Sequence, residues 1–427
     1  MLKIFKRGET PDAELVRREA GAANVTDTVA AIIADVRQNG DAALLAYNAR
    51  FDRAEGVALE VTAEELDAAC GRVDPELVKV MELAAENIRA FHSRQLSHGY
   101  IMSGKNGSLL GQRVIPLRRV GLYIPGGTAA YPSSVLMNCI PAKIAGVDEI
   151  VMTTPASGGA VSDVILAAAK IAGVDRVFRV GGAQAVAALA YGTETVPQVD
   201  KIVGPGNAFV AEAKRQVFGQ VAIDMIAGPS EILVVSDGKS DPKWLAADLL
   251  SQAEHDKLAT AILITDSMPL AEAVQAEVER QLAVLPREEI ARAAIEANGK
   301  IIVTGTLDEA VEMANAVAPE HLELAVDSPF DFLPKVRNAG SIFLGRYCPE
   351  PLGDYLSGTN HTLPTMGTAR FSSPLGVEDF VKRSYFSYYT ADALEQVADA
   401  AALFADAEGL HGHAVSATAR RNGGEGK

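Results

Sequence analysis

The chain has 427 residues, 48% of them hydrophobic and 22% charged, and is long enough for two or more domains with buried cores. Its formal net charge of −16 argues against binding to a nucleic-acid backbone, which depends on clusters of Lys and Arg, although a small anionic cofactor could still be held by backbone N–H groups. Three widely spaced cysteines, an N-terminus that turns polar too early for a signal peptide, and the lack of an apolar run long enough to span a bilayer predict a cytoplasmic protein.

Helical patterns dominate residues 25–104. Val25-Thr26-Asp27 can cap a helix over residues 28–37, which Asn39-Gly40 is expected to end. A second, amphipathic helix is predicted from Pro75 to about Ser103. This part of the chain is therefore expected to be helical throughout.

From residue 114 onward, strand and helix patterns alternate in two blocks with short Gly-rich joints, which predicts an α/β fold with parallel sheets. The first block has predicted strands at 120–125, 149–152, 176–180 and 200–203, and predicted helices from about Pro132 and at 163–172, 183–191 and 207–217. The second block has predicted strands at 232–235, 261–264, 301–303 and 341–344, and predicted helices at 241–254, 269–283, 287–297 and 307–317. Residues 345–376 show no periodicity and are expected to form a long functional loop, which an Ala-rich helix follows from about residue 391.

Gln252 and His255 lie at the end of the helix predicted at 241–254. Their spacing of three residues places both side chains on one helix face. An amide oxygen and an imidazole nitrogen can both bind a metal ion, so the two residues form half of a candidate zinc site. The alternative is that both side chains only bond to backbone groups or water.

Glu320 and His321 are the clearest candidates for proton transfer. Pro319 stops the preceding helix, so the two residues lie at a helix-to-strand junction, a frequent place for active sites in α/β folds. A carboxylate beside an imidazole supplies two proton acceptors that can titrate near neutral pH. A capping or ion-paired Glu-His is the alternative.

Further candidate ligands follow toward the C-terminus. Asp354 and His361 lie in the long loop, where Asp354 could be an anionic metal ligand, or the two could be a turn aspartate and a surface histidine. Glu408 and His413 follow the tail helix, in a segment that could equally be disordered. Together these segments offer Gln, His, Asp and His, which suffices for a four-coordinate zinc ion.

Gly-rich joints carry a second type of chemistry. Gly181-Gly182-Ala183-Gln184 and Gly204-Pro205-Gly206-Asn207 each open a helix after a strand, and such helix N-termini bind anions. Neither matches G-x-G-x-x-G, so the standard dinucleotide fingerprint is absent. Ala227 to Glu231 form a tight turn in which Ser230 could meet a ligand.

These segments, in this order, resemble the histidinol dehydrogenase family from about residue 25 to 420. Each motif alone is weak, but nine in register are highly specific. The motifs are Tyr123-Ile124-Pro125-Gly126-Gly127, Gly181-Gly182-Ala183-Gln184-Ala185, Val203-Gly204-Pro205-Gly206-Asn207, Ala227-Gly228-Pro229-Ser230-Glu231, Ser251-Gln252-Ala253-Glu254-His255, Ala318-Pro319-Glu320-His321-Leu322, Gly353-Asp354-Tyr355, Asn360-His361-Thr362-Leu363-Pro364-Thr365 and Glu408-Gly409-Leu410.

The resemblance implies the last step of histidine biosynthesis, in which two NAD+ oxidise L-histidinol to L-histidine through L-histidinaldehyde. It implies that Glu320 activates water and that His321 is the base for both oxidations. Zinc would be bound by Gln252, His255, Asp354 and His413, of which His413 comes from the partner subunit and is favoured over His411 by its spacing from Glu408. Substrate contacts would come from Ser230, His321, His361 and Glu408 as well as the zinc ligands, and NAD contacts from Tyr123, Gln184 and Asn207.

The family resemblance also implies an architecture of two incomplete Rossmann-like domains with parallel sheets. Residues 1–20 would be an N-terminal segment, 21–122 and 231–380 the larger domain, and 123–230 the second domain. Residues 381–427 would form a tail domain that contributes to the partner's site in an intertwined homodimer.

Three alternatives remain open from the sequence. The closest is a dehydrogenase of the same scaffold that oxidises another alcohol, such as a sulfonated diol. The others are a zinc hydrolase, which would need metal but no NAD, and a catalytically silent paralogue. The segment from Ala318 to Leu324 and the Glu408 tail favour histidinol, whose amine needs a carboxylate partner.

Overall fold

The computed structural model describes residues 2–18, 24–126 and 130–421, and the chain divides into two compact units. The large unit comprises residues 1–95 and 117–380, and the small unit comprises residues 96–116 and 381–427. Gly127 of the first motif and the end of the expected 1–20 segment lie outside the described residues.

A six-stranded parallel sheet forms one half of the large unit. Its order is β1 (Lys3–Lys6), β11 (Lys300–Val303), β10 (Thr260–Thr265), β9 (Glu231–Ser236), β12 (His321–Ala325) and β13 (Ser341–Leu344). The central strands are nearly continuous runs of Ile, Leu and Val, as expected for strands buried on both faces. In β9, Ile232 and Val234 belong to one core cluster, whereas Leu233 and Val235 belong to the other.

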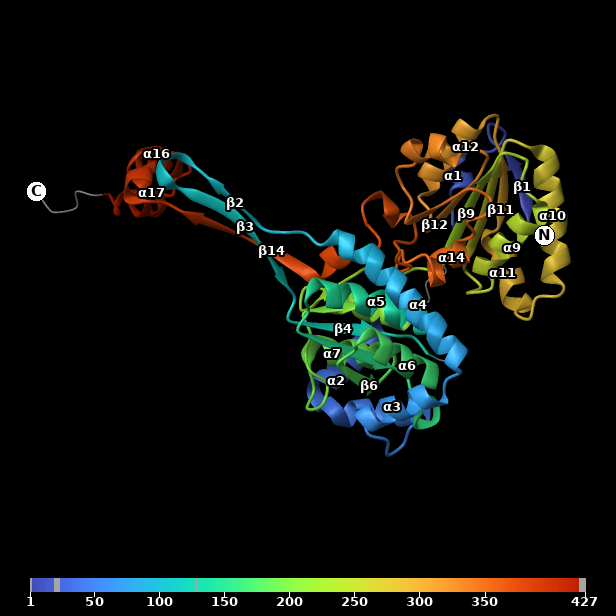
Figure 1. Ribbon diagram of the computed structural model, residues 1–427, viewed down its shortest axis with the longest axis horizontal. Helices are drawn as coiled ribbons and strands as arrows, with labels where there is room; N and C mark the ends of the chain where they lie inside the picture. The colour runs from blue at the N-terminus through green and yellow to red at the C-terminus, as the bar shows by residue number, and fades with distance from the viewer. Residues whose placement is uncertain (1, 19–23, 127–129, 422–427) are drawn as a thin grey trace, which may run out of the picture. The chain divides into compact units, whose positions relative to one another are not determined.

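Helices cover both faces of this sheet (Figure 1). On one face lie α9 (Pro242–Ala253), α10 (Met268–Leu282) and α11 (Glu288–Asn298), and on the other lies α12 (Leu307–Val317) together with Leu15 of α1 (Asp12–Leu15). The edge strand β1 was not predicted from the sequence, because a four-residue strand that begins and ends with lysine carries almost no periodic signal.

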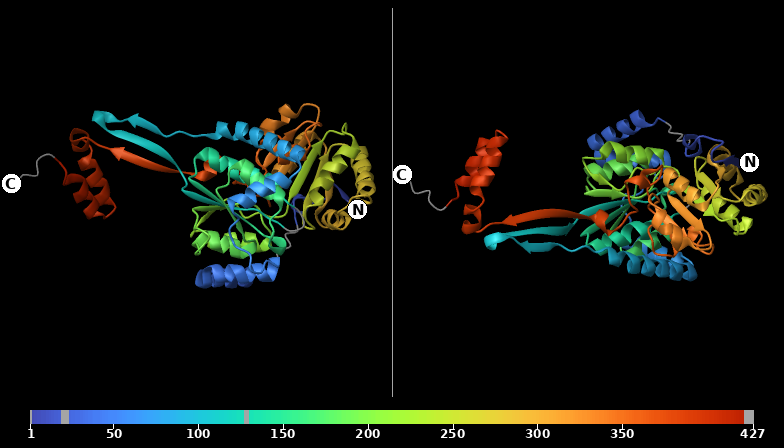
Figure 2. Two further views of the ribbon diagram at one scale, coloured as in Figure 1. Left: turned by 60° about the horizontal axis from the view of Figure 1, so that its bottom comes forward. Right: turned by 90° about the horizontal axis from the view of Figure 1, so that it is seen from above.

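A five-stranded parallel sheet forms the other half of the large unit. Its order is β6 (Arg176–Arg179), β5 (Glu149–Thr154), β4 (Arg119–Tyr123), β7 (Lys201–Val203) and β8 (Ala222–Ile223). One face packs on α2 (Thr26–Tyr47), α7 (Gly182–Tyr191) and α8 (Ala208–Val217), while α5 (Pro132–Ala145), which contacts β4 and β5, packs next to α6 (Asp163–Ala172) (Figures 1 and 2). The predicted α/β class with parallel sheets is therefore confirmed.

The N-terminal helices pack on the smaller sheet. Val29, Ile33 and Leu44 of α2 belong to the core cluster of the five-stranded sheet, whereas the sequence-based assignment grouped residues 21–122 with the larger domain. Within α2 the backbone leaves helical geometry at Gly40 (φ 51°), where the sequence predicted the helix to end, and then resumes as far as Tyr47. The remaining domain boundaries stay predictions.

The helix predicted from Pro75 to Ser103 is too long. It ends as α4 (Pro75–His92) and is followed by a short 3-10 turn (Ser93–Gln95). Residues Tyr100–Ser103 form strand β2, which pairs antiparallel with β3 (Leu109–Pro116). Long-range pairing with β3 thus overrides the local helical pattern.

The small unit is a three-stranded antiparallel sheet with three helices. The sheet order is β14 (Val381–Tyr388), β3 and β2, and the helices are α15 (Ala391–Glu395), α16 (Ala398–Ala407) and α17 (His411–Thr418). The histidine-containing tail is therefore helical where it is described. Few side chains of this unit are buried, and many large apolar ones are exposed, including Tyr100, Ile101, Met102, Tyr385, Leu403, Phe404 and Val415.

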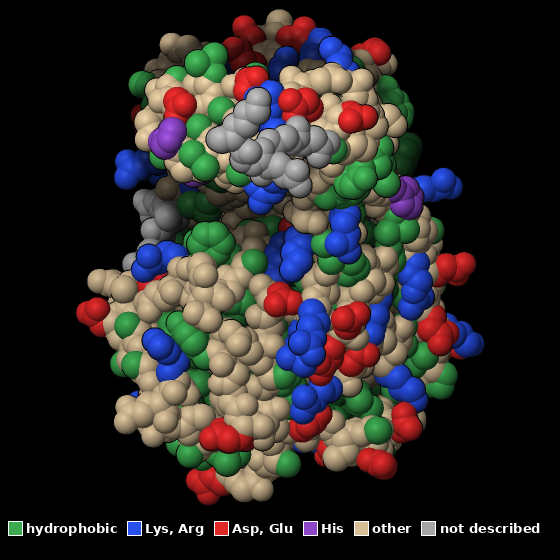
Figure 3. All heavy atoms as spheres, turned by 90° about the vertical axis from the view of Figure 1, so that its left-hand side faces the viewer, with side chains coloured by type: hydrophobic (Ala, Val, Ile, Leu, Met, Phe, Trp, Pro, Cys, Tyr) green, Lys and Arg blue, Asp and Glu red, His purple; other side chains and the backbone are tan. Residues whose placement is uncertain are grey.

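None of the helices in the described ranges is long and apolar enough to cross a bilayer. On the face drawn in Figure 3, acidic and basic side chains are interspersed with hydrophobic ones.

Candidate active site

The junction between α12 and β12 positions Glu320 and His321. Ala318 caps α12 in a left-handed conformation (φ 51°, ψ 64°), which costs a residue with a Cβ roughly 1 kcal/mol or more. Pro319 then turns the chain so that Glu320 precedes β12 and His321 begins it. Both side chains are buried, at 7% and 3% exposure. The pair therefore lies at the amino end of β12, and not at the carboxyl end that α/β folds more often use.

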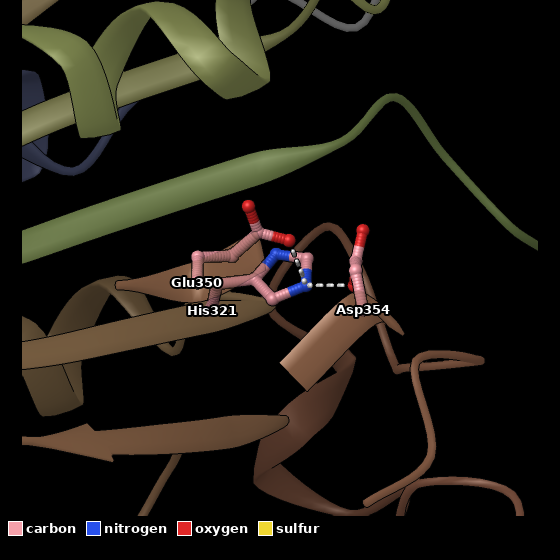
Figure 4. Close-up of side chains that lie close together, drawn as sticks. All are labelled: His321, Glu350 and Asp354. Carbon is pink, nitrogen blue, oxygen red and sulfur yellow. Dashed lines mark ion pairs between the residues drawn. The ribbon is translucent and has the colours of Figure 1, made fainter. Parts of the chain in front are cut away.

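A backbone carbonyl of the adjacent strand holds the imidazole of His321 in one orientation. Its Nδ1 lies 2.9 Å from the carbonyl oxygen of Glu231, the first residue of the adjacent strand β9, and so is the ring nitrogen that donates. Nε2 is buried and has no hydrogen-bond partner among the described residues. It lies 3.7 Å from carboxylate oxygens of both Glu350 and Asp354, and Figure 4 shows these side chains directed at the imidazole.

The three side chains form a compact cluster. His321, Glu350 and Asp354 each bring one nitrogen or oxygen atom to within 4.8 Å of the others. Glu350 and Asp354 come from α14 (Glu350–Tyr355), a helical turn inside the segment expected to be a loop. Gln252, at the end of α9, lies beside Glu350, but neither atom of its buried amide makes a hydrogen bond of normal geometry with a described residue. Buried polar groups without partners are rare, so the cluster is built to receive a polar ligand.

The charges of the cluster shift the proton affinities of its members. Burial raises the pKa of Glu320 to about 8, against the opposing effect of His321. Burial alone would lower the pKa of His321, but Glu320, Asp354 and Glu350 outweigh it and raise that pKa. Asp354 is partly buried, which by itself would raise its pKa, yet the neighbouring imidazoles of His321 and His361 keep that pKa below the ordinary value. Strongly shifted pKa values in one buried cluster are typical of functional sites.

His255 and His361 lie at the edge of this cluster. The backbone N–H of His255 donates to the Gln252 carbonyl at 3.1 Å, and its exposed side chain is close enough to Asp354 for their charges to interact. His361 places Nδ1 3.1 Å from the backbone oxygen of Asp354 and Nε2 3.3 Å from the hydroxyl of Ser134 on α5. The structure thus places Gln252, His255, His321, Asp354 and His361 in one region, and their roles there remain predictions.

The residues expected at a cofactor site lie at the carboxyl end of the five-stranded sheet. Tyr123 ends β4, and its hydroxyl accepts a hydrogen bond from the Gly182 N–H at 3.1 Å. Gln184 is buried in the first turn of α7. The Asn207 side-chain oxygen caps α8 by accepting from Phe209 and Val210. Gln184 and Asn207 therefore lie at the N-termini of two helices that follow strands, and the Tyr123 hydroxyl contacts the first of these helices.

The remaining candidates have less definite surroundings. Ser230 precedes β9, where its carbonyl accepts from the Thr260 N–H at 2.9 Å. Glu408 ends α16 and His413 lies in α17, both exposed in the small unit. Their proposed roles at the site remain predictions.

Two buried acids of this region were not anticipated from the sequence. Glu350 was hidden in the segment treated as a loop, although Pro349 followed by an acid is a helix-start signal. Glu231 was seen only as part of a turn motif, since nothing local shows that it contacts Glu320 and His321.

The chain has a parallel α/β fold with a buried acid–imidazole pair beside N and O groups of the kind that bind metal ions, an arrangement typical of the active sites of α/β enzymes. A sequence model of histidinol dehydrogenase matches residues 15–421. The histidinol dehydrogenase of Geobacter metallireducens is 56% identical over 414 residues, covering 96% of this chain and 95% of the relative, and that of Lactiplantibacillus plantarum is 55% identical over 396 residues, covering 93% and 92%.

The crystal structure of histidinol dehydrogenase from Elizabethkingia anophelis superposes with a TM-score of 0.93 at 36% identity, covering 98% of each chain. The chain therefore belongs to the histidinol dehydrogenase family.

Proposed function

We propose that this protein is a histidinol dehydrogenase that oxidises L-histidinol to L-histidine with two NAD+, through L-histidinaldehyde. The observation that carries the proposal is the Glu320–His321 pair, which is buried beside Asp354 in a chain that matches the family along nearly its whole length. An alcohol-to-acid oxidation needs a proton acceptor at each step and one water, which this pair can serve.

Each residue of the pair has a distinct task. His321 would accept the hydroxyl proton at Nε2 in the alcohol oxidation, release it to solvent, and then accept the hydroxyl proton of the aldehyde hydrate. NAD, when bound, would supply the hydride acceptor for both oxidations. Glu320 takes a proton from the water whose oxygen adds to the aldehyde carbon. The raised pKa of Glu320 suits a base that works near neutral to mildly alkaline pH.

The donor set fits a zinc ion. Gln252, His255 and Asp354, with His413 of the partner subunit, would hold it, and the unpartnered amide of Gln252 supports this assignment. Zinc would hold the amine and imidazole nitrogens of the substrate, and its charge would offset the carboxylates that raise the pKa of His321. Ser230, His361 and Glu408 would contact the rest of histidinol.

NAD would bind at the carboxyl end of the five-stranded sheet, with Tyr123, Gln184 and Asn207 lining its site. Helix N-termini at Gly182 and Asn207 offer backbone N–H groups to its phosphates.

The active unit would be a homodimer with shared sites. The small unit exposes more apolar side chains than it buries, which favours coverage by a second copy of the chain. A cytoplasmic location is proposed as well, and the three free cysteines fit a reducing compartment.

A dehydrogenase for another alcohol, such as a sulfonated diol, is the second candidate. The neighbouring imidazoles keep the pKa of Asp354 low, so its carboxylate is ionised, favours a cationic substrate and would repel a sulfonate.

The stoichiometry of NADH tests the proposal. Purified protein with about one zinc per chain should form two NADH for each L-histidinol consumed. One NADH per histidinol, no NADH at all, or full activity of metal-stripped protein would overturn it. As a test of the roles, Glu320→Gln should slow oxidation of histidinal more than His321→Asn does, and equal losses would contradict the assignment.

A further inference from the structure

Glu231 contacts both members of the Glu320–His321 pair. It begins β9, directly beside the start of β12, and is 2% exposed. Its backbone N–H donates to Oε2 of Glu320 at 2.9 Å, and its own Oε2 accepts the Glu320 backbone N–H at 3.3 Å. Its carbonyl oxygen accepts from Nδ1 of His321 at 2.9 Å.

The two glutamates therefore hold each other reciprocally. Each backbone N–H bonds to the carboxylate of the other residue, which ties Oε2 of Glu320 in place. The remaining oxygen of Glu320, Oε1, accepts no hydrogen bond from another described residue, so it can accept one from a water molecule. The orientation of the carboxylate is thereby set by β9 and not by β12 alone.

Glu231 and Glu320 are close enough for the charge of one to disfavour ionisation of the other, and Arg18 supplies a counter-charge. Its Nε lies 3.1 Å from Oε1 of Glu231, and the two side chains are 8% and 2% exposed. Arg18 also donates to the carbonyl oxygen of Val317, the last residue of α12. The same oxygen of Glu231 accepts the backbone N–H of Met366 at 3.3 Å, which fastens the loop that follows His361.

We infer that Glu231, with Arg18 as its counter-ion, is a positioning residue that orients the Glu320 carboxylate toward the attacking water and fixes the ring nitrogen of His321 that faces the substrate. The inference rests on the proposed function.

The carboxylate and the backbone of Glu231 have separable effects. Glu231→Gln keeps the carbonyl that holds His321 but replaces an acceptor with an N–H₂ group that faces the Glu320 N–H. Oxidation of histidinal, which needs Glu320, should therefore lose at least about tenfold in kcat, at 1.4 kcal/mol per factor of ten. The KM for histidinol and the zinc content should stay within about twofold, because the contacts of Glu231 with other described residues include no hydrogen bond or ion pair to Gln252 or Asp354.

A double variant keeps the test valid if Glu231→Gln leaves Arg18 buried without a partner and unfolds the protein. Arg18→Met with Glu231→Gln removes both charges and should restore the melting temperature but not the kcat for histidinal. A matched control is Arg346→Met with Asp237→Asn, a largely buried ion pair near the opposite end of β9, which should leave kcat within about twofold.

Recovery of wild-type kcat in the folded double variant would overturn the inference, since Glu231 would then only neutralise Arg18. Equal losses in the double variant and its control would overturn it too. Failure of the wild-type protein to oxidise histidinol would instead refute the proposed function, so the two failures are distinguishable.

Discussion

Glu323→Gln should make the protein more stable, and increasingly so as the pH rises. Glu323 lies in β12 two residues after His321 and is 3% exposed. One of its side-chain oxygens accepts a hydrogen bond from the backbone N–H of Glu350 at 2.7 Å. Its carboxyl group also forms a hydrogen bond with the carboxyl group of Asp248 on α9. Burial, with the nearby charge of Asp248, raises the pKa of Glu323 well above its ordinary value.

The sign and size of the effect follow from proton linkage. The native state keeps a proton on Glu323 that the unfolded chain releases above about pH 4.3, so the native state binds more protons and loses stability as the pH rises. The loss is about 1.4 kcal/mol per pH unit while Glu323 holds its proton in the native state. Glutamine mimics the protonated acid without this cost, since its amide can donate to Asp248 and accept from Glu350. The variant should therefore gain stability relative to the wild type as the pH rises, by up to about 3 kcal/mol over two pH units if Glu323 keeps its proton throughout.

Urea unfolding at pH 5, 6 and 7 measures this difference. The single tryptophan, Trp244, lies in α9 one turn from Asp248 and reports unfolding of the six-stranded sheet. Glu272→Gln, an exposed position on α10, is the matched control and should show no widening difference. Parallel stability curves for Glu323→Gln and the wild type would refute the reasoning, because Glu323 would then be ionised in the native state.

Three further predictions concern the site. The rate of histidinal oxidation at saturating NAD should rise with pH toward about 8, because burial raises the pKa of Glu320 to that value and only its ionised form accepts a proton; a flat pH profile would exclude Glu320 as the base. Lys214→Met should destabilise the protein by about 3–5 kcal/mol in thermal melts, since it leaves the buried Asp224 carboxylate without its ion-pair partner. It should also raise the KM for NAD in initial-rate assays, because it frees the Gly204 carbonyl oxygen, to which Lys214 Nζ donates at 3.0 Å. Mixing inactive His413→Ala and Gln252→Ala subunits should restore part of the activity, and no recovery at any ratio would count against a shared site.

Segments with strong local signals were predicted closely. Helix α12 matches its predicted bounds because Thr306 caps its start by accepting the Glu309 N–H and Pro319 stops the chain soon after its end. Helix α6 matches as well, between Ser162 and Gly173 at its two ends.

The remaining features depend on contacts far apart in sequence. Strand β2 has a sequence that also suits a helix, and only its pairing with β3 decides between them. In the site, Gln252, Asp354 and His321 could be proposed from residue type, because amides, carboxylates and imidazoles bind cations. The pairing of Glu231 with Glu320 and Arg18 could not be predicted, because the three residues lie far apart in the sequence and only the fold brings them together.

The two proposed binding sites lie at opposite ends of their helices: the metal and substrate site at helix C-termini, and the NAD site at helix N-termini. Gln252 and His255 lie at the C-terminal end of α9, and Glu320 follows the C-terminal end of α12, where the helix dipole is negative and favours a cation. Gly182 and Asn207 lie at the N-terminal ends of α7 and α8, where the dipole is positive and favours an anion. Backbone polarity alone would therefore sort an ammonium-bearing substrate and its metal to one sheet and a pyrophosphate to the other, before any side chain contributes a charge.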